Sequence, residues 1–212
     1  MKCYARWTKD KDMFFRDQTI LQFGNSWDIV ANLILLNPGS AVPKSDETMD
    51  EMLASKNLPF FRKSNINQHY HEFTIDPLMR NIINCFSKMH DGGVIKIYNL
   101  FNLKNQDSNQ AILEYQQNIN NPYIHTDESD IIYDDKKVII ATGESNLTDE
   151  LMIELKKFIQ LGDENKLYAL QKSDTKEFTF VKTSINQDGF VNSFHPSYTF
   201  AYGNKTLCGK NS

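Results

Sequence analysis

The sequence has no long apolar run and no excess of positive charge. No stretch of its 212 residues approaches the roughly 18 apolar residues that span a membrane. Its start, rich in Lys and Asp, does not resemble a signal peptide. The chain holds 23 Lys and Arg against 27 Asp and Glu, a net charge of −4, so no overall basic field attracts nucleic acid or a membrane. These absences predict a cytoplasmic protein without a membrane partner.

Cysteine is also scarce. Cys3, Cys85 and Cys208 are odd in number and widely spaced, without the spacing of a metal or redox motif, which predicts reduced thiols. His69 and His71 alternate along the chain, but no further Cys or His follows at ligand spacing. The sequence also lacks a Gly-rich phosphate loop and a dinucleotide fingerprint. We therefore expect neither a metal nor a cofactor.

Short apolar runs alternate with helical patterns through the middle of the chain. Four runs have the length of buried strands: Leu33–Leu36, Val94–Tyr98, Val138–Ala141 and Leu167–Leu170. Helices are expected to begin at Asp76-Pro77, at Ser108 and at Thr148, where capping residues precede apolar positions at helical spacing. This alternation predicts one domain over residues 1–212, with a three-layer α/β/α fold and a mostly parallel central sheet of about four strands.

Hairpins are expected at the edges of this sheet. Aromatic and polar residues alternate from Tyr4 to Phe23, which favours an antiparallel hairpin or edge pair. A polar turn separates Phe178–Val181 from Gly189–Val191 and suggests a second hairpin leading to His195. A short helix is expected around Thr48 to Ser55.

Three of the expected parallel strands end in small or polar turns. Asn37-Pro38-Gly39 follows the first strand, Asn99 the second and Thr142-Gly143 the third. Such ends open on one edge of the sheet, where open α/β sheets bind their ligands. An asparagine there offers a donor and an acceptor, which suits reading a nucleobase edge or fixing a water. Asn and Gly also close strands because they tolerate turn geometry.

His195 is the natural partner for these asparagines. It lies in a small polar turn and can donate a hydrogen bond to a carbonyl that gains charge in a transition state. A turn histidine satisfied by backbone groups is the alternative. Phe101, just beyond Asn99, is a candidate for stacking on a flat ligand, although an aromatic residue at that position also suits the core. We expect Asn37, Asn99 and His195 to face one cavity.

The order of three segments resembles a bacterial and phage family known as domain of unknown function 1643. The segments are Leu36-Asn37-Pro38-Gly39-Ser40-Ala41, Tyr98-Asn99-Leu100-Phe101 and His195-Pro196-Ser197, and the resemblance runs from about Tyr4 to Tyr198. The same landmarks are similar to those of the uracil-DNA glycosylase superfamily. That similarity implies a uracil-DNA glycosylase-like fold and a nucleobase pocket.

The resemblance also implies a role for each matched residue. Asn37 and His195 become the catalytic residues, because the first holds the water and the second stabilises the leaving anion. Asn99 reads the base and Ser197 touches phosphate. The strongest glycosylases carry an acid in the first motif, where this chain has Asn37, which implies weak water activation. The remaining candidates for base or ligand binding are Gly39, Ser40 and Phe101.

The leading hypothesis is therefore a DNA glycosylase-like protein of DNA repair. It binds a flipped-out nucleobase at the carboxyl edge of the sheet and, if active, hydrolyses an N-glycosidic bond. One alternative is a non-catalytic module that binds a nucleotide or nucleic acid, of phage or phage-defence origin. Another is an interaction protein with an exposed aromatic patch around Phe194 to Phe200. Nucleic acid is favoured if Arg62, Lys63, Lys104 and Lys205 surround the pocket mouth.

Overall fold

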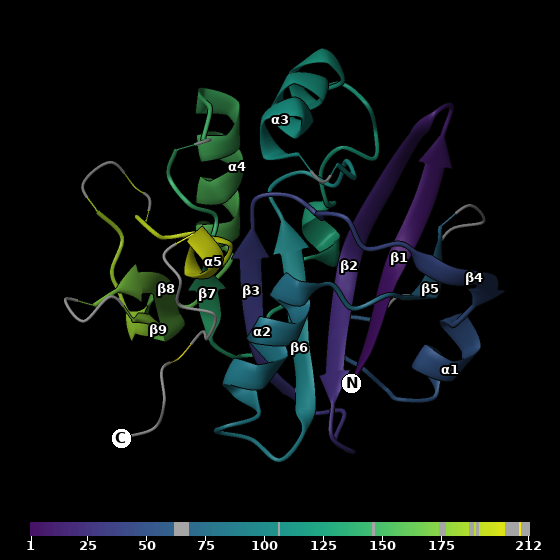
Figure 1. The fold of residues 1–212 in the computed structure, drawn as a ribbon, viewed down its shortest axis with the longest axis horizontal. Coiled ribbons are helices and arrows are strands. Elements are labelled where there is room, and N and C mark those ends of the chain that lie inside the picture. Colours follow the sequence, from purple (N-terminus) through teal and green to yellow (C-terminus); the bar gives the residue numbers. More distant parts are fainter. Residues whose placement is uncertain are drawn as a thin grey trace.

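The computed structural model describes residues 1–61, 68–105, 107–145, 147–173, 177–186, 189, 191–201 and 208. Within them, nine strands form one sheet in the order β4-β5-β1-β2-β6-β3-β7-β8-β9 (Figure 1). The strands are β1 (Lys2–Asp10), β2 (Met13–Phe23), β3 (Ile29–Leu35), β4 (Pro43–Thr48), β5 (His69–Phe73), β6 (Gly93–Asn99), β7 (Val138–Ile140), β8 (Leu167–Lys172) and β9 (Phe178–Lys182).

The predicted mostly parallel sheet of about four strands, with a uracil-DNA glycosylase-like fold, is wrong. The sheet is mixed, and most neighbouring strands in it are antiparallel. Parallel pairing is confined to the neighbours β6-β3-β7-β8. The missed strands carry no apolar run, since β4 is exposed along most of its length and β5 contains alternating histidines. Polar outer strands of this kind give no signal of burial in the sequence.

The predicted edge hairpins also need correction. The hairpin of β1 and β2 forms, but it lies inside the sheet, because β5 pairs with β1 and β6 pairs with β2. The second predicted hairpin does not form as expected. Strand β9 pairs with β8, and Val191 lies outside the strands. Strand β9 is therefore the second strand of a hairpin with β8, the strand that directly precedes it in the chain.

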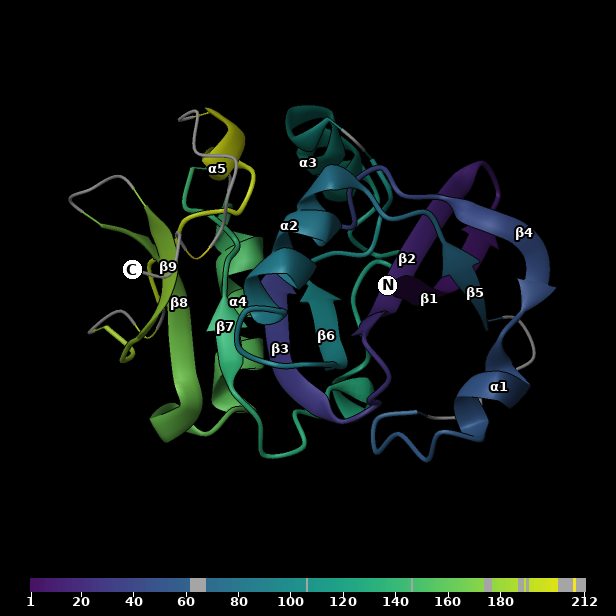
Figure 2. The same ribbon diagram turned by 60° about the horizontal axis from the view of Figure 1, so that its bottom comes forward.

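Helices cover both faces of the sheet (Figure 2). The structure contains α1 (Asp50–Ala54), α2 (Pro77–Phe86), α3 (Ser108–Gln117), α4 (Asp149–Gln160) and α5 (Tyr198–Ala201), with 3₁₀ turns at Glu128–Asp130 and Glu164–Lys166. Helix α2 packs on one face, and α3 and α4 pack on the other. The parallel strands therefore lie between two helical layers.

Capping residues set where the longer helices begin. Asp76 caps α2 through a side-chain oxygen that accepts from the Met79 N–H at 2.8 Å. Thr148 caps α4, as predicted. Helix α3 is capped by Asp107 rather than Ser108, because the Asp107 carboxylate accepts two backbone N–H groups of the first turn. A charged acceptor at this position satisfies donors that have no partner within the helix.

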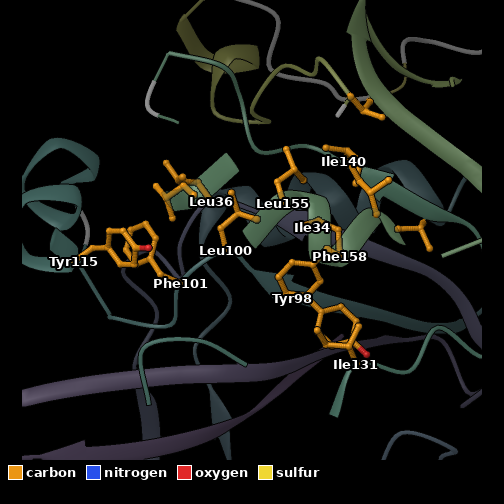
Figure 3. Packing of buried hydrophobic residues seen from close by; sticks show 14 of the residues in the cluster. Ile34, Leu36, Tyr98, Leu100, Phe101, Tyr115, Ile131, Ile140, Leu155 and Phe158 are labelled. Atoms are coloured by element: carbon orange, nitrogen blue, oxygen red, sulfur yellow. The ribbon is translucent and has the colours of Figure 1, made fainter. Parts of the chain in front are cut away.

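Alternate residues of the central strands fill two separate cores. On β3, Leu33 and Leu35 pack with the residues of α2, whereas Ile34 joins the cluster built with α3 and α4. Figure 3 shows the second cluster, with Ile34 and Tyr98 close to Phe158 of α4. This period of two is that of a strand buried on both faces.

A β-bulge interrupts the pairing of β1 with β2. The register shifts between Tyr4 and Arg6, and Gln18 on the opposite strand has a positive φ of 51°. In a regular strand Arg16 and Leu21 lie on opposite faces, because they are an odd number of residues apart. Here both face the side of α2, since Leu21 belongs to that core and the Arg16 guanidinium lies over the Phe73 ring. The bulge therefore turns Arg16 toward α2.

A network of buried charges crosses the same hairpin. Arg6 Nε donates to Asp17 Oδ1 at 2.8 Å, and Arg6 also forms salt bridges with the second Asp17 oxygen and with Asp130. Lys96 is completely buried and donates to the Gln18 side chain. Burial lowers the pKa of Lys96 well below its ordinary value. The Arg6 charge is therefore paired by two carboxylates inside the protein.

The prediction of reduced cysteines is wrong for two of the three. Cys85 at the end of α2 and Cys208 form a disulfide, with Cα atoms 5.4 Å apart, and Cys3 is free and buried. Distance along the chain conceals this pair, since 123 positions separate the two cysteines. In the part of the chain that the structure describes, we find no helix with the length and apolarity to cross a membrane.

Candidate functional site

A cavity of about 260 Å³ lies at the carboxyl ends of β3 and β6, beside the first turn of α2. Residues from both strand ends and from the segment after β9 contribute to it. Six of the seven predicted site residues line this cavity: Asn37, Gly39, Ser40, Asn99, His195 and Ser197. The structure thus brings together three segments that are far apart in the sequence, at the edge where parallel strands end.

Asn99 is the buried polar group of the cavity. It is the last residue of β6 and pairs in register with Leu35, which places it on the same side of the sheet as α2. The residue is 1% exposed, and among the described residues neither its amide nitrogen nor its amide oxygen has a hydrogen-bond partner. Buried polar groups are nearly always paired in folded proteins. A ligand in the cavity could satisfy this unpaired donor and acceptor, so Asn99 is a candidate ligand-binding group.

Asn37 is oriented by the loop that follows β6. Its side-chain nitrogen donates to the Asn105 carbonyl at 3.0 Å. This bond leaves the Asn37 carbonyl oxygen as the group able to accept from a water. Gly39 follows in the same loop with a φ of +73°, a conformation that favours glycine. A side chain at Gly39 would lie 3.8 Å from Asp76 Oδ2, so this loop and the start of α2 are close neighbours.

His195 is held against the ends of two parallel strands. The preceding residue, Phe194, donates its N–H to the Leu170 carbonyl of β8 at 2.8 Å. Beneath the histidine lies Gly143, which follows β7 and has a φ of +75°. A Cβ atom at Gly143 would lie 3.1 Å from the Cβ of His195, closer than ordinary contact. The predicted glycine turn therefore makes room for the histidine.

The hydrogen bonds of His195 select one form of the ring. Its Nδ1 accepts from the Ser197 backbone N–H at 3.3 Å and lies 2.8 Å from the Ser197 hydroxyl. Because Nδ1 acts as an acceptor, the proton of the neutral ring resides on Nε2. His195 thus offers an N–H donor without carrying a charge, and Ser197 fixes its orientation.

We expect the His195 ring to titrate at a pKa of about 4 instead of 6.5, because desolvation disfavours the imidazolium. The unfolded chain then binds this proton first as the pH falls. Stability is therefore lost progressively between pH 6.5 and about 4. Imidazole NMR shifts followed against pH measure this directly, with a histidine in a short unstructured peptide as the reference. A midpoint near 6.5 for His195 would contradict the environment described.

Two charged residues of the cavity are missing from the sequence-based prediction. Arg16 lines it because the bulge at Gln18 turns the side chain toward α2. Asp76 also lines it, although the sequence marks this residue only as a helix cap. The sequence gives no sign of the bulge, so it could not have identified Arg16 as a cavity residue. Asp76 could have been identified, because it is an acid at the start of a helix that follows a predicted strand edge. Among the described lining residues, the one carboxylate therefore comes from the start of α2 and not from the Asn37 loop.

Phe101 does not belong to the site, and its prediction as a stacking residue is wrong. The side chain is completely buried in the cluster on the α3 side of the sheet. Its ring centroid lies 4.9 Å from that of Tyr115, and Figure 3 shows the two rings together. The chain continues past Asn99 into the core, so Phe101 turns away from the cavity.

Other predicted features lie elsewhere. Lys104 does not line the cavity, and Arg62, Lys63 and Lys205 fall outside the described residues. The aromatic patch proposed around Phe194 to Phe200 is not exposed where it is described, because Phe194 and Tyr198 pack partly buried against the core. His69 lies with its Nδ1 3.2 Å from an Asp50 oxygen. His71, on the same strand, is half-buried.

Comparison with family models, with curated protein sequences and with solved structures finds no match to this chain. The resemblance to the domain of unknown function 1643 family therefore remains a prediction from short motifs.

Proposed function

We propose that the cavity binds a nucleobase and hydrolyses the N-glycosidic bond that joins the base to its sugar. The observation that carries this proposal is the unpaired amide of Asn99, buried in the same cavity as Asn37 and His195. A nucleobase edge presents neighbouring donors and acceptors, the complement of a free amide group. The cavity volume of about 260 Å³ leaves room for a small planar guest.

Each polar residue has a distinct part in this reaction. The C1′–N bond breaks with its electron pair moving to the base, and the oxygen of a water then bonds to C1′. Asn37 positions that water, and the Asp76 carboxylate accepts its proton. Meanwhile, the Nε2–H of neutral His195 donates a hydrogen bond to the oxygen on which charge develops. Little covalent chemistry is required of the protein itself.

A second function is favoured by the charges around the cavity. Arg16 is the only Lys or Arg among the described lining residues, and the chain carries a net charge of −4. DNA binding relies on several cations placed against phosphates. This distribution favours a free nucleoside or nucleotide over duplex DNA, held in the same cavity without being cut. Exposed Ser40 at the rim is available to a phosphate group.

The experiment measures release of free base from nucleosides and from oligonucleotides that carry modified bases, the latter by alkaline cleavage. We expect Asn37→Ala and His195→Ala each to reduce release by about 10²-fold or more, the usual effect of removing a group that stabilises a transition state. Asn84→Ala on α2 and His69→Ala on β5 are matched controls at exposed positions. Both controls should retain wild-type activity.

The outcomes separate the two functions. Wild-type rates in Asn37→Ala and in His195→Ala would refute the hydrolase. Binding of a base or nucleotide that survives Asn37→Ala, without base release by the wild-type protein, would establish the binding module instead.

A further inference from the structure

Arg16 is a buried cation without a counter-ion in direct contact. The residue is 3% exposed, yet it forms no salt bridge with a carboxylate of the described residues. Its Nε has no hydrogen-bond partner among the described residues, and one terminal nitrogen donates to the Ala41 carbonyl at the long distance of 3.5 Å. The guanidinium also lies 5.6 Å from the centre of the Phe73 ring. The described residues therefore satisfy the donors of Arg16 poorly.

Arg6 provides a comparison within the same hairpin. Its guanidinium is similarly buried, but it contacts Asp17 through two nitrogens and Asp130 through a third. A buried charge is normally compensated in this way, because removing it from water is costly. The fold therefore supplies carboxylates to one arginine of the hairpin, while the other faces a cavity.

Asp76, the acid that lines the same cavity, does not act as a direct counter-ion to Arg16. Asp76 lines the cavity and attracts Arg16 electrostatically, but no salt bridge joins them. One Asp76 oxygen is engaged by the Met79 N–H at the start of α2. The cavity thus holds one cation and one carboxylate that do not neutralise each other by contact, and an anionic guest on the Arg16 side would complete the pairing.

Arg16 and Asn99 bring different unsatisfied groups, a charged donor and a neutral amide, to the same cavity. Both line the cavity, both are almost completely buried, and both have atoms that lack hydrogen-bond partners. The amide offers one donor and one acceptor, whereas the guanidinium offers donors and a full positive charge. A neutral ring satisfies the first group only. A ring with an anionic oxygen satisfies both.

We propose that Arg16 makes this cavity a receptor for an anionic oxygen, so that its guest is a planar heterocycle bearing a carboxylate or ionised oxygen. Asn99 hydrogen-bonds the ring edge, and Arg16 binds the anionic group. This inference rests on the proposed function only in taking the guest to be a planar base. It adds a specificity-determining residue and names the class of base.

Binding measured by calorimetry tests the inference, with uracil, uracil-6-carboxylate and inorganic phosphate as probes. We expect the wild-type protein to bind uracil-6-carboxylate about tenfold or more tightly than uracil, the ratio expected from one charge-assisted contact. In Arg16→Met the two rings should bind equally. Arg80→Met, an exposed arginine on α2, is the matched control and should preserve the preference.

A thermal melt of each free variant separates recognition from a structural role. If Arg16 serves a ligand, Arg16→Met should melt no lower than wild type, because an uncompensated buried charge is lost. A lower melting temperature together with an unchanged preference for the carboxylate overturns the proposal. Equal binding of both rings by the wild-type protein overturns it as well, and so does phosphate binding as tight as that of the carboxylate.

If Arg16→Met does not fold, Arg16→Lys is the variant to test. The lysine ammonium is a point charge and cannot reproduce the planar two-nitrogen contact of a guanidinium, so the preference for the carboxylate should fall severalfold.

Base release reports independently on the proposed function. Asn37→Ala and His195→Ala should lose release, whatever their affinity for the carboxylate. A protein that binds uracil-6-carboxylate but never releases base would support the anion receptor and refute the hydrolase.

Discussion

Replacing Asn99 with leucine should abolish binding of the guest and at the same time raise the free energy of unfolding. Both amide atoms of Asn99 are buried without a partner in the described part of the chain, and each such group costs about 1–3 kcal/mol. Leucine has a similar volume and removes that cost, so we expect a gain of at least about 1 kcal/mol. Affinity should fall by about 10²-fold or more, because the site loses its hydrogen bonds to the ring edge. Urea denaturation and calorimetry measure the two effects.

Asn102 provides the control for this substitution. It is also 1% exposed and lies three residues further along, but its amide nitrogen donates to the Tyr123 carbonyl at 3.2 Å. Asn102→Leu should therefore destabilise the protein, since it leaves that carbonyl unpaired. If Asn99→Leu lowers stability as much as Asn102→Leu does, Asn99 supports the fold and is not a ligand-binding group.

Removing the Asp17 carboxylate should cause the largest loss of stability. Asp17→Ala leaves Arg6 buried with Asp130 as its remaining acidic partner, where the native network has two. Breaking a buried ion pair typically costs about 3–5 kcal/mol, and here the Arg6 charge stays inside the protein with only one of its two carboxylates. The arginine and aspartate side chains are only 11% and 9% exposed, so water cannot replace the lost carboxylate. The midpoint of urea denaturation reports the change.

An exposed ion pair supplies the comparison. Lys44 and Glu72 are joined at 2.6 Å, but the lysine side chain is 49% exposed. Glu72→Ala should therefore cost less than about 1 kcal/mol. Similar losses in Glu72→Ala and Asp17→Ala would mean that burial does not control the strength of the Arg6 network.

The sequence predicts the elements of the fold better than their arrangement. Apolar runs mark β3, β6, β7 and β8, and the capping residues Asp76 and Thr148 mark two helix starts. The mixed sheet was not predictable from the same signals. Its outer strands pair with partners distant in sequence, and β4 is largely exposed, so burial leaves no periodic pattern in it.

For the candidate site, the rule on strand ends places Asn37, Asn99 and His195 in one cavity, and their roles remain predictions. Arg16 was missed because simple alternation places it on the wrong face when a bulge intervenes. Phe101 was misjudged because nearness to Asn99 in the chain does not fix the direction of a side chain beyond the end of a strand.

The bond between Cys85 and Cys208 gives the chain an unusual connectivity. It closes a covalent macrocycle that contains Asn99 and His195, while Arg16 and Asn37 belong to the linear portion before it. The cavity is thus lined both by residues of the disulfide-closed loop and by residues of the segment that precedes Cys85. A single proteolytic cut within the ring, for example at the exposed turn of Asp134 and Asp135, leaves every fragment still joined. The residues that line the cavity of a nicked molecule therefore remain in one covalent unit for as long as the sulfur atoms stay oxidised.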